Sequence, residues 1–451
     1  MAPPATPQEN CQPPPKGFLH RLKYLGPGLI VSGSIVGSGE LIATTTLGAQ
    51  AGFAALWIIL FSCIIKVVVQ EELGRYTLAS GETTFRALNR VPGRAGPLSW
   101  VVWCWAIMFL GLTLLSGGIV GSVGQTLNLA FPQLPANVWM LFVAVVTALI
   151  LIIKGEFRFI QRAAAVLVFA FTVITVLCAV MLQWTPYAMN LPEVLRGLAL
   201  KMPDQGLHVA FAVFGITGIS AAELVMYPYW CLEKGYARLA GPRQDSEDRA
   251  ARAKGWLRVL QLDVLVAMVL YTLATVAFYF LGAAVLHARG QVPAGNEMVR
   301  TLSQIYTATL GPWAFVLFLA GAFAVLYSTL FVHAASYPRL LIDFLELLGL
   351  LRVGNDVKKR WQWLRRLTLL LVSLYVVWYV LLEAPVVMVL IGGALQSFML
   401  PILAGSALYL RYKHLDHRLM PSGIIDLLLW LSASAMLVFA IYSLVVLMQR
   451  L

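Results

Sequence analysis

The chain has 451 residues, of which 60% are apolar and only 12% carry a charge. A soluble globular protein has about 25% charged residues, so this composition excludes an ordinary soluble enzyme and predicts a protein that crosses a lipid bilayer. The net charge of +12 does not indicate a nucleic-acid partner, because the basic residues lie in loops between apolar segments.

Eleven apolar segments approach or reach the roughly 20 residues that a membrane-spanning helix needs. In chain order they are Leu25–Leu47, Phe53–Val69, Pro97–Gly117, Val138–Ile153, Ile160–Met181, Val209–Leu232, Gln261–Leu286, Pro312–His333, Leu367–Leu382, Pro385–Leu410 and Ile424–Met448. The Pro-rich residues 1–24 are expected to form a flexible cytoplasmic tail, and residues 25–451 a single transmembrane domain.

The distribution of basic residues predicts the orientation. With the N-terminus inside, 27 of the 33 Lys and Arg residues lie on the cytoplasmic side and five lie outside, while Lys66 falls within the second segment. Because cytoplasmic loops of membrane proteins are enriched in Lys and Arg, we expect a cytoplasmic N-terminus and an external C-terminus. The richest stretches, Lys234–Arg258 and Lys358–Arg366, are expected to be solvated loops.

Two of the eleven segments are interrupted by small residues. The first contains Ser34 followed six residues later by Glu40-Leu41-Ile42, and the sixth contains Thr217 followed six residues later by Glu223-Leu224-Val225. The two copies lie five segments apart, and an odd number of helices per repeat inverts the second copy. Matching interruptions in inverted halves indicate the binding site of a secondary transporter. The repeats cover about 25–181 and 209–410, and 424–448 is an extra helix.

The two glutamates favour a site over simple close packing of helices. Glycines such as Gly37 and Gly39 could merely let helices approach each other. An ionised carboxylate near the middle of a bilayer, however, costs about 2.5–3.5 kcal/mol on insertion scales. Glu40 and Glu223 are therefore expected either to bind a substrate or coupling ion or to be protonated or paired, with Lys66 as the intramembrane base.

Several stretches resemble the Nramp metal-ion transporters. Gly26–Ser32 and Gly48–Gly52 resemble the family's first helix, Leu56-Trp57 its second, and Ala394–Ser397 with Pro401 its tenth. The resemblance implies an all-α polytopic membrane protein with the LeuT-type fold, in which two inverted five-helix repeats are followed by an eleventh helix.

The metal-binding motifs of that family are replaced in this chain. Gly37-Ser38-Gly39-Glu40 stands where the first helix has Asp-Pro-Gly-Asn, and Ala222-Glu223-Leu224 stands where the sixth has Met-Pro-His. No carboxylate occurs from Trp100 to Gln125, although the family's third helix carries them. Gln396 matches a residue of the family's occluded site. Loss of the soft thioether ligand argues against selectivity for transition metals.

The replacements suggest an anion site. A Gly-Ser-Gly break resembles the carboxylate-binding turn of amino-acid transporters with this architecture, where amide N–H groups and a helix N-terminus meet an anion. Ser38 and Ser220 could add hydroxyl donors, and Ser328 and Thr329 lie where this fold often binds sodium. The predicted substrate site therefore comprises Gly37, Ser38, Gly39, Glu40, Ser220, Ala222, Glu223 and Gln396, and the coupling-ion site Glu40, Glu223, Ser328 and Thr329.

The sequence thus favours a secondary transporter of a small anion such as bicarbonate, coupled to sodium or protons. The alternative is a carrier of a hard divalent cation, Mg²⁺ or Mn²⁺, with Glu40 and Glu223 as its metal ligands. No cofactor and no enzymatic motif are recognised. The expected setting is a prokaryotic inner membrane, with a monomer embedded in the lipid bilayer.

Overall fold

The computed structural model describes residues 11–37, 39–154, 157–203, 205–241, 246–354 and 356–449. Its elements are α1 (Phe18–Leu22), α2 (Pro27–Ile35), η1 (Gly39–Thr44), α3 (Thr45–Ala51), η2 (Gly52–Ala55), α4 (Leu56–Ser80), α5 (Thr84–Leu88), β1 (Arg94–Ala95), β2 (Leu98–Ser99), α6 (Trp100–Ala130), α7 (Ala136–Lys154), α8 (Phe157–Met181), η3 (Leu182–Trp184), α9 (Leu191–Arg196), α10 (Leu207–Ile216), α11 (Ala221–Lys234), α12 (Tyr236–Ala240), α13 (Glu247–Leu281), η4 (Gly282–Leu286), η5 (Gly295–Glu297), α14 (Met298–Leu310), α15 (Ala314–Leu347), α16 (Val357–Leu382), α17 (Pro385–His414), η6 (His417–Leu419) and α18 (Gly423–Gln449). Within the described ranges the strands form one antiparallel pair.

The helices account for the eleven apolar segments. Nine helical segments of the described chain are long and apolar enough to cross a membrane. The first of these, Pro27–Ser80, holds two predicted segments that meet at the 3₁₀ turn η2. The helix α8 supplies a further one, because it covers the predicted segment Ile160–Met181. An all-α membrane protein is therefore confirmed.

Several helices continue beyond their apolar part. α13 begins at Glu247 rather than at Gln261, and α16 begins at Val357. The expectation of solvated loops over the two most basic stretches is therefore wrong in part. Arg249, for example, is buried and donates to the carbonyl of Ala79. Hydropathy marks only the lipid-facing length of a helix, so it does not detect such polar extensions.

Part of the N-terminal tail is ordered against the helices. The backbone N–H of Gln12 donates to Leu239 O at 3.1 Å, and Trp256 Nε1 donates to Gln12 O at 3.1 Å. The short helix α1 follows. The prediction of a flexible tail over residues 1–24 therefore does not hold for residues 11–24, and residues 1–10 lie outside the described ranges.

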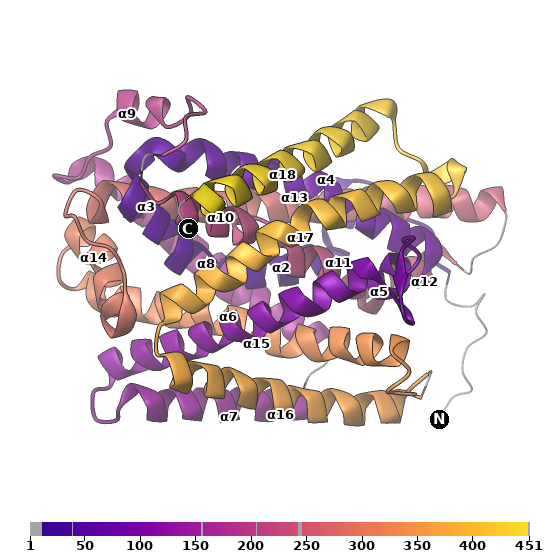
Figure 1. The fold of residues 1–451 in the computed structure, drawn as a ribbon, viewed down its shortest axis with the longest axis horizontal. Coiled ribbons are helices and arrows are strands. Elements are labelled where there is room, and N and C mark those ends of the chain that lie inside the picture. The colour runs from indigo at the N-terminus through magenta and orange to yellow at the C-terminus, as the bar shows by residue number, and fades with distance from the viewer. Residues whose placement is uncertain are drawn as a thin grey trace.

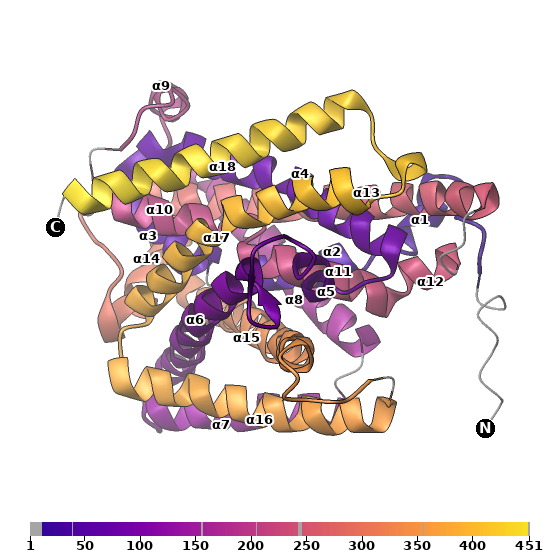
Figure 2. The same cartoon turned by 45° about the vertical axis from the view of Figure 1, so that its right-hand side comes forward.

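The interrupted helices lie in the middle of the bundle. α2 packs against α8, α11, α13 and α15, and α10 packs against α17. α7 and α16 run side by side along one edge, and α18 lies at the opposite edge (Figures 1 and 2). The two half-helices of each interrupted segment are thereby shielded from lipid by the surrounding helices.

The N-terminal end of α2 is anchored by a buried carboxylate. Asp263 of α13 accepts the backbone N–H of Gly26 at 2.8 Å and that of Gly28 at 2.6 Å, and Tyr227 OH donates to it at 3.1 Å. The first N–H groups of a helix have no partner inside the helix, and a carboxylate also complements the positive end of the helix dipole. This contact fixes where the first interrupted helix begins.

Candidate functional site

The structure contains both interruptions that the sequence predicts. α2 ends at Ile35, and the chain resumes at Gly39 as the π-helix η1. α10 ends at Ile216, Thr217 is extended, and α11 begins at Ala221. Gly218 has φ +64°, a left-handed conformation that favours glycine.

A small cavity lies where the two breaks meet α6, α15 and α17. Its volume is about 20 Å³, which is space for about one water molecule. It is lined by Ser34, Ile35, Gly39, Leu115, Ile216, Ser220, Glu223, His333, Tyr337 and Gln396. Polar side chains from four helices therefore converge on the interrupted backbone.

Glu223 is the acidic group of this cavity. Ser34 Oγ donates to Glu223 Oε1 at 2.6 Å, and His333 Nε2 lies 3.0 Å from Ser34 Oγ and 3.9 Å from Glu223 Oε1. His333 Nδ1 lies 3.1 Å from Ser116 Oγ, which donates its own proton to Leu112 O. Ser116 can therefore accept the Nδ1–H of His333. Because Ser34 gives its own proton to Glu223, the contact between Nε2 and Ser34 Oγ needs a proton on Nε2, and a bound cation would take the place of that proton.

The first turn of α11 is capped by groups of the protein itself. Ser220 Oγ donates to Gln396 Oε1 at 2.5 Å, and Ala222 N–H donates both to Ser220 Oγ and to Gln396 Oε1, each at 3.2 Å. The N–H of Glu223 points at Ser220 Oγ at 3.5 Å. An anion would have to displace these acceptors to reach the amides at the start of α11.

Glu40 does not line the cavity. Its Oε1 accepts from Thr275 Oγ1 of α13 at 2.9 Å, and its Oε2 is buried without a hydrogen-bond partner among the described residues. The hypothesis of a metal held by Glu40 and Glu223 together is therefore not matched by this arrangement, in which only Glu223 faces the cavity.

Ser328 and Thr329 of α15 lie against the end of α2, as the sodium-site hypothesis expects. Ser328 Oγ donates to Gly33 O at 3.1 Å, and Thr329 Oγ1 donates to Ser34 O at 3.1 Å. A Cβ atom at Gly37 would overlap Thr329 Oγ1 at 1.6 Å. Glycine at this position therefore lets the first break pack directly onto α15.

Lys66 does not pair with either glutamate. Among the described residues, its Nζ donates to the carbonyl oxygens of Phe214 and Thr217. The second helix thus supplies a cation to the backbone of the sixth helix instead of to a side-chain carboxylate.

The structure brings most of the predicted substrate residues together. Gly39, Ser220, Glu223 and Gln396 line the cavity, and Ala222 borders an adjoining space around Glu223 and His333. Ser38 lies outside the described residues. Ser34, Tyr337 and His333 were missed as site residues. Two features of the sequence could have identified them. Ser34 is the first residue of the repeated motif, and His333 lies one helical turn after Thr329, at the predicted end of the eighth segment.

A cation in the cavity would meet mixed oxygen and nitrogen donors. Among the described residues, no group of three or more His, Cys, Asp or Glu side chains could hold a metal ion. Glu223 offers a carboxylate, His333 an imidazole nitrogen, and Ser34 and Gln396 offer neutral oxygens. This donor set suits a hard or borderline divalent cation.

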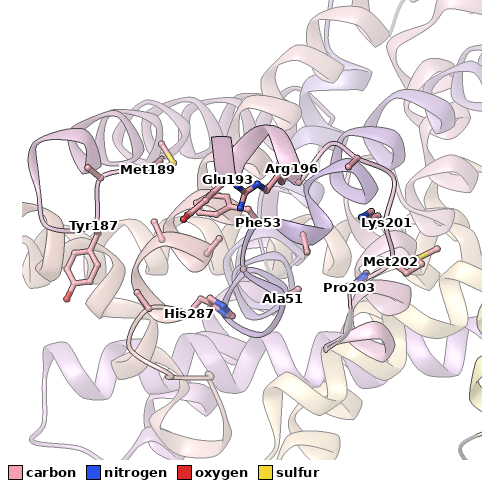
Figure 3. Close-up of a pocket in the computed structure, with 18 of the residues that line it drawn as sticks. Ala51, Phe53, Tyr187, Met189, Glu193, Arg196, Lys201, Met202, Pro203 and His287 are labelled. Carbon is pink, nitrogen blue, oxygen red and sulfur yellow. The ribbon is translucent and has the colours of Figure 1, made fainter. Parts of the chain in front are cut away.

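A second, larger cavity of about 810 Å³ lies between the turn after α3, the stretch around α9 and the end of η4. Arg196, Lys201 and His287 line it together with Glu193 and Phe53 (Figure 3). It shares no lining residue with the cavity at the breaks. Its mixed-charge wall therefore lies at the ends of α3 and η4 and in the connections around α9, away from the two breaks.

Comparison with protein families finds one model over most of the chain. The family described as natural resistance-associated macrophage protein-like matches residues 28–446. The chain is 26% identical over 315 residues to a divalent metal cation transporter, MntH, of Deinococcus radiodurans. That match covers 69% of this chain and 66% of the relative, so it spans just under two thirds of the relative's length.

Solved structures share the fold. A manganese transporter of Eremococcus coleocola, crystallised as a point mutant, matches with a TM-score of 0.70 and 16% identity, and the match covers 96% of this chain and 89% of that one. MhsT, crystallised with L-phenylalanine, matches with a TM-score of 0.55 and 13% identity over 98% of this chain and all of that one. These similarities confirm the LeuT-type fold predicted from the sequence.

Proposed function

The chain belongs to the Nramp family, and on that premise we propose that it is a secondary transporter of a divalent metal cation, with Mn²⁺ as the substrate that fits its site best. The ion binds in the cavity between the two breaks. Its ligands are Glu223 Oε1, His333 Nε2 and oxygen atoms of Ser34 and Gln396.

One observation carries this assignment: a carboxylate and an imidazole nitrogen stand 3.9 Å apart at an interrupted helix, with a hydroxyl oxygen between them. The imidazole is oriented through Nδ1 by Ser116, which is how metal-binding histidines are commonly held in place. The relatives named as divalent metal cation transporters support the same substrate class.

The size and chemistry of the cavity favour Mn²⁺ over Mg²⁺. Mg²⁺ gives up its water reluctantly and usually keeps several water molecules, whereas the cavity of about 20 Å³ holds about one. Mn²⁺ accepts carboxylate and carbonyl oxygens, and the His333 nitrogen adds a borderline ligand. The cavity has no thioether ligand, so a marked preference for softer ions is not expected.

Bicarbonate, the substrate that the sequence favoured, has less support than the metal alternative. The amides at the start of α11 are occupied by Ser220 and Gln396, and Glu223 would repel an anion unless it were neutralised. An anion also needs more space than this cavity offers. The bicarbonate hypothesis is therefore kept as a comparison in the uptake experiment.

We further propose that protons drive the transport and that Glu40 carries the proton. Glu40 is completely buried, and one of its carboxylate oxygens has no partner among the described residues. An ionised carboxylate in that setting is costly, and binding a proton removes the cost. Glu40 also lies next to the first break, so its protonation can accompany movement of the half-helices.

The test is uptake into proteoliposomes of Mn²⁺, Mg²⁺ and bicarbonate, with proton and sodium gradients imposed separately. We expect saturable Mn²⁺ uptake that an inward proton gradient accelerates. Glu223→Gln should lower the affinity for Mn²⁺ by at least about tenfold to a hundredfold, because that is the loss typical of residues that only support a metal ligand. Glu193→Gln, at an exposed position of α9, is the matched control and should transport normally.

Two results would contradict the metal assignment. The first is saturable bicarbonate uptake without any Mn²⁺ or Mg²⁺ uptake. The second is a Glu223→Gln variant that binds and transports Mn²⁺ like the unmodified protein.

A further inference from the structure

Lys66 is a completely buried lysine in the middle of α4. Its Nζ donates to Phe214 O and to Thr217 O, each at 2.6 Å. The ring of Phe214 adds a cation–π contact, with its centroid 5.1 Å from Nζ. A buried ammonium group needs such partners, because an isolated charge away from water is strongly disfavoured.

The two carbonyls belong to the end of an interrupted helix. Phe214 is in the last turn of α10, and Thr217 is its extended C-terminal cap. The last carbonyls of a helix have no partner in the helix, and they form the negative end of its dipole. Ser62 Oγ, one turn before Lys66, points at the same two oxygens at 3.2 and 3.0 Å.

Two backbone carbonyls and one hydroxyl at the end of a half-helix form the kind of oxygen cluster that holds a monovalent cation in broken-helix transporters. We propose that the break of the sixth helix contains a monovalent-cation site and that the ammonium group of Lys66 occupies it. This transporter thus carries a tethered cation where a free ion would otherwise bind.

The tethered cation has a consequence for the neighbouring substrate site. Thr217 lies three residues before Ser220, which caps α11 and contacts Gln396. By holding the carbonyl of Thr217, Lys66 fixes the path of the break that places Ser220 and Glu223 at the cavity. Lys66 is therefore a positioning residue, and its role rests in part on the proposed function of that cavity.

The experiment removes the lysine and offers a small cation in its place. Lys66→Ala leaves room beside the carbonyls, and methylammonium chloride is the probe. We expect this variant to melt at a lower temperature than the unmodified protein in choline chloride without metal, and to regain thermal stability in methylammonium chloride. The unmodified protein should respond equally to both salts.

A matched variant tests the role of the charge. Lys66→Met fills the space with a side chain of similar length but without a donor, so it should be destabilised and should not respond to methylammonium. Lys66→Ala should lower Mn²⁺ uptake in choline chloride, and methylammonium should restore it. Uptake by this variant should also be faster in sodium than in choline. The stability measurement needs no substrate, so it separates failure of this site from failure of the metal assignment.

The proposal is overturned by either of two outcomes. One is a Lys66→Met variant as stable and active as the unmodified protein. The other is a Lys66→Ala variant whose stability and uptake are the same in methylammonium and choline. Failure of this variant to fold in both salts counts as the same result.

Discussion

Glu40 and Glu223 occupy matching positions after the two breaks but have different surroundings. Glu223 shares the cavity with His333 and Ser34, whereas Glu40 turns to Thr275 of α13. The repeated motif places both carboxylates at the same depth and does not determine which way each side chain points. In the proposed mechanism, this difference would let Glu223 bind the substrate while Glu40 carries the proton.

Glu40→Gln tests this division of roles. The amide still offers an acceptor to Thr275 but cannot be ionised, so Mn²⁺ binding should stay within about twofold, because Glu40 is not a ligand. Uptake should lose its acceleration by an inward proton gradient. The measurement is Mn²⁺ uptake by this variant with and without the gradient, beside calorimetric binding. Gradient-driven uptake that persists would remove Glu40 from the coupling mechanism.

His333 and Ser34 show why part of the site could not be predicted. His333 meets Ser34 from 299 positions away in the chain and Ser116 from 217 positions away. A histidine in an apolar helix is visible in the sequence, but its partners depend on how α2, α6 and α15 pack. The residues that were predicted, such as Glu223 and Gln396, stand out through a repeated motif or a family resemblance.

At the scale of elements, both breaks follow from local sequence, whereas the π-helix after the first does not. Gly37 and Gly218 mark the interruptions, and each glycine is required by a close approach or a positive φ. The six residues Gly39–Thr44 are too few for an apolar pattern to distinguish a π-helix from an α-helix. Local signals therefore locate a break but do not determine the geometry beside it.

Gly218→Ala tests the second break. An alanine there must adopt a left-handed conformation, which costs about 1–2 kcal/mol, and its Cβ would lie 3.0 Å from Cys63 Cα. We expect a lower melting temperature and weaker Mn²⁺ binding. The control is Gly405→Ala in α17, where a Cβ meets nothing within 4 Å; this helix position should gain up to about 1 kcal/mol. A Gly218→Ala variant as stable as Gly405→Ala would show that the break tolerates an ordinary backbone.

At the scale of the whole molecule, the apolar segments and their interruptions predicted two inverted repeats, and the resemblance to the Nramp transporters implied the LeuT-type fold. Eleven segments with matching breaks in the first and the sixth are typical of two inverted repeats and a further helix. The packing order could not be read from hydropathy, because lipid-facing and buried helices are similarly apolar. α7, at the edge of the bundle, and α10, at its centre, are both strongly apolar.

The orientation of the molecule in the membrane remains a prediction that the arrangement supports. α1, α12 and the connection between α15 and α16 lie at one end of the bundle, while α9 and the last turns of α18 lie at the other (Figures 1 and 2). The two most basic stretches thus share an end with α1. Because basic loops remain on the cytoplasmic side, that end should face the cytoplasm.

Cysteine labelling in intact cells tests this orientation. Cys63, Cys178 and Cys231 are buried, so replacing Cys11 and Cys104 by serine should leave a protein that reacts little with maleimide. In that background Lys201→Cys, exposed near α9, should react with a membrane-impermeant maleimide in intact cells. Arg352→Cys, exposed between α15 and α16, should react only after permeabilisation. The reverse pattern would place the basic end outside, and labelling of both in intact cells would mean that the two ends do not lie on opposite sides of the membrane.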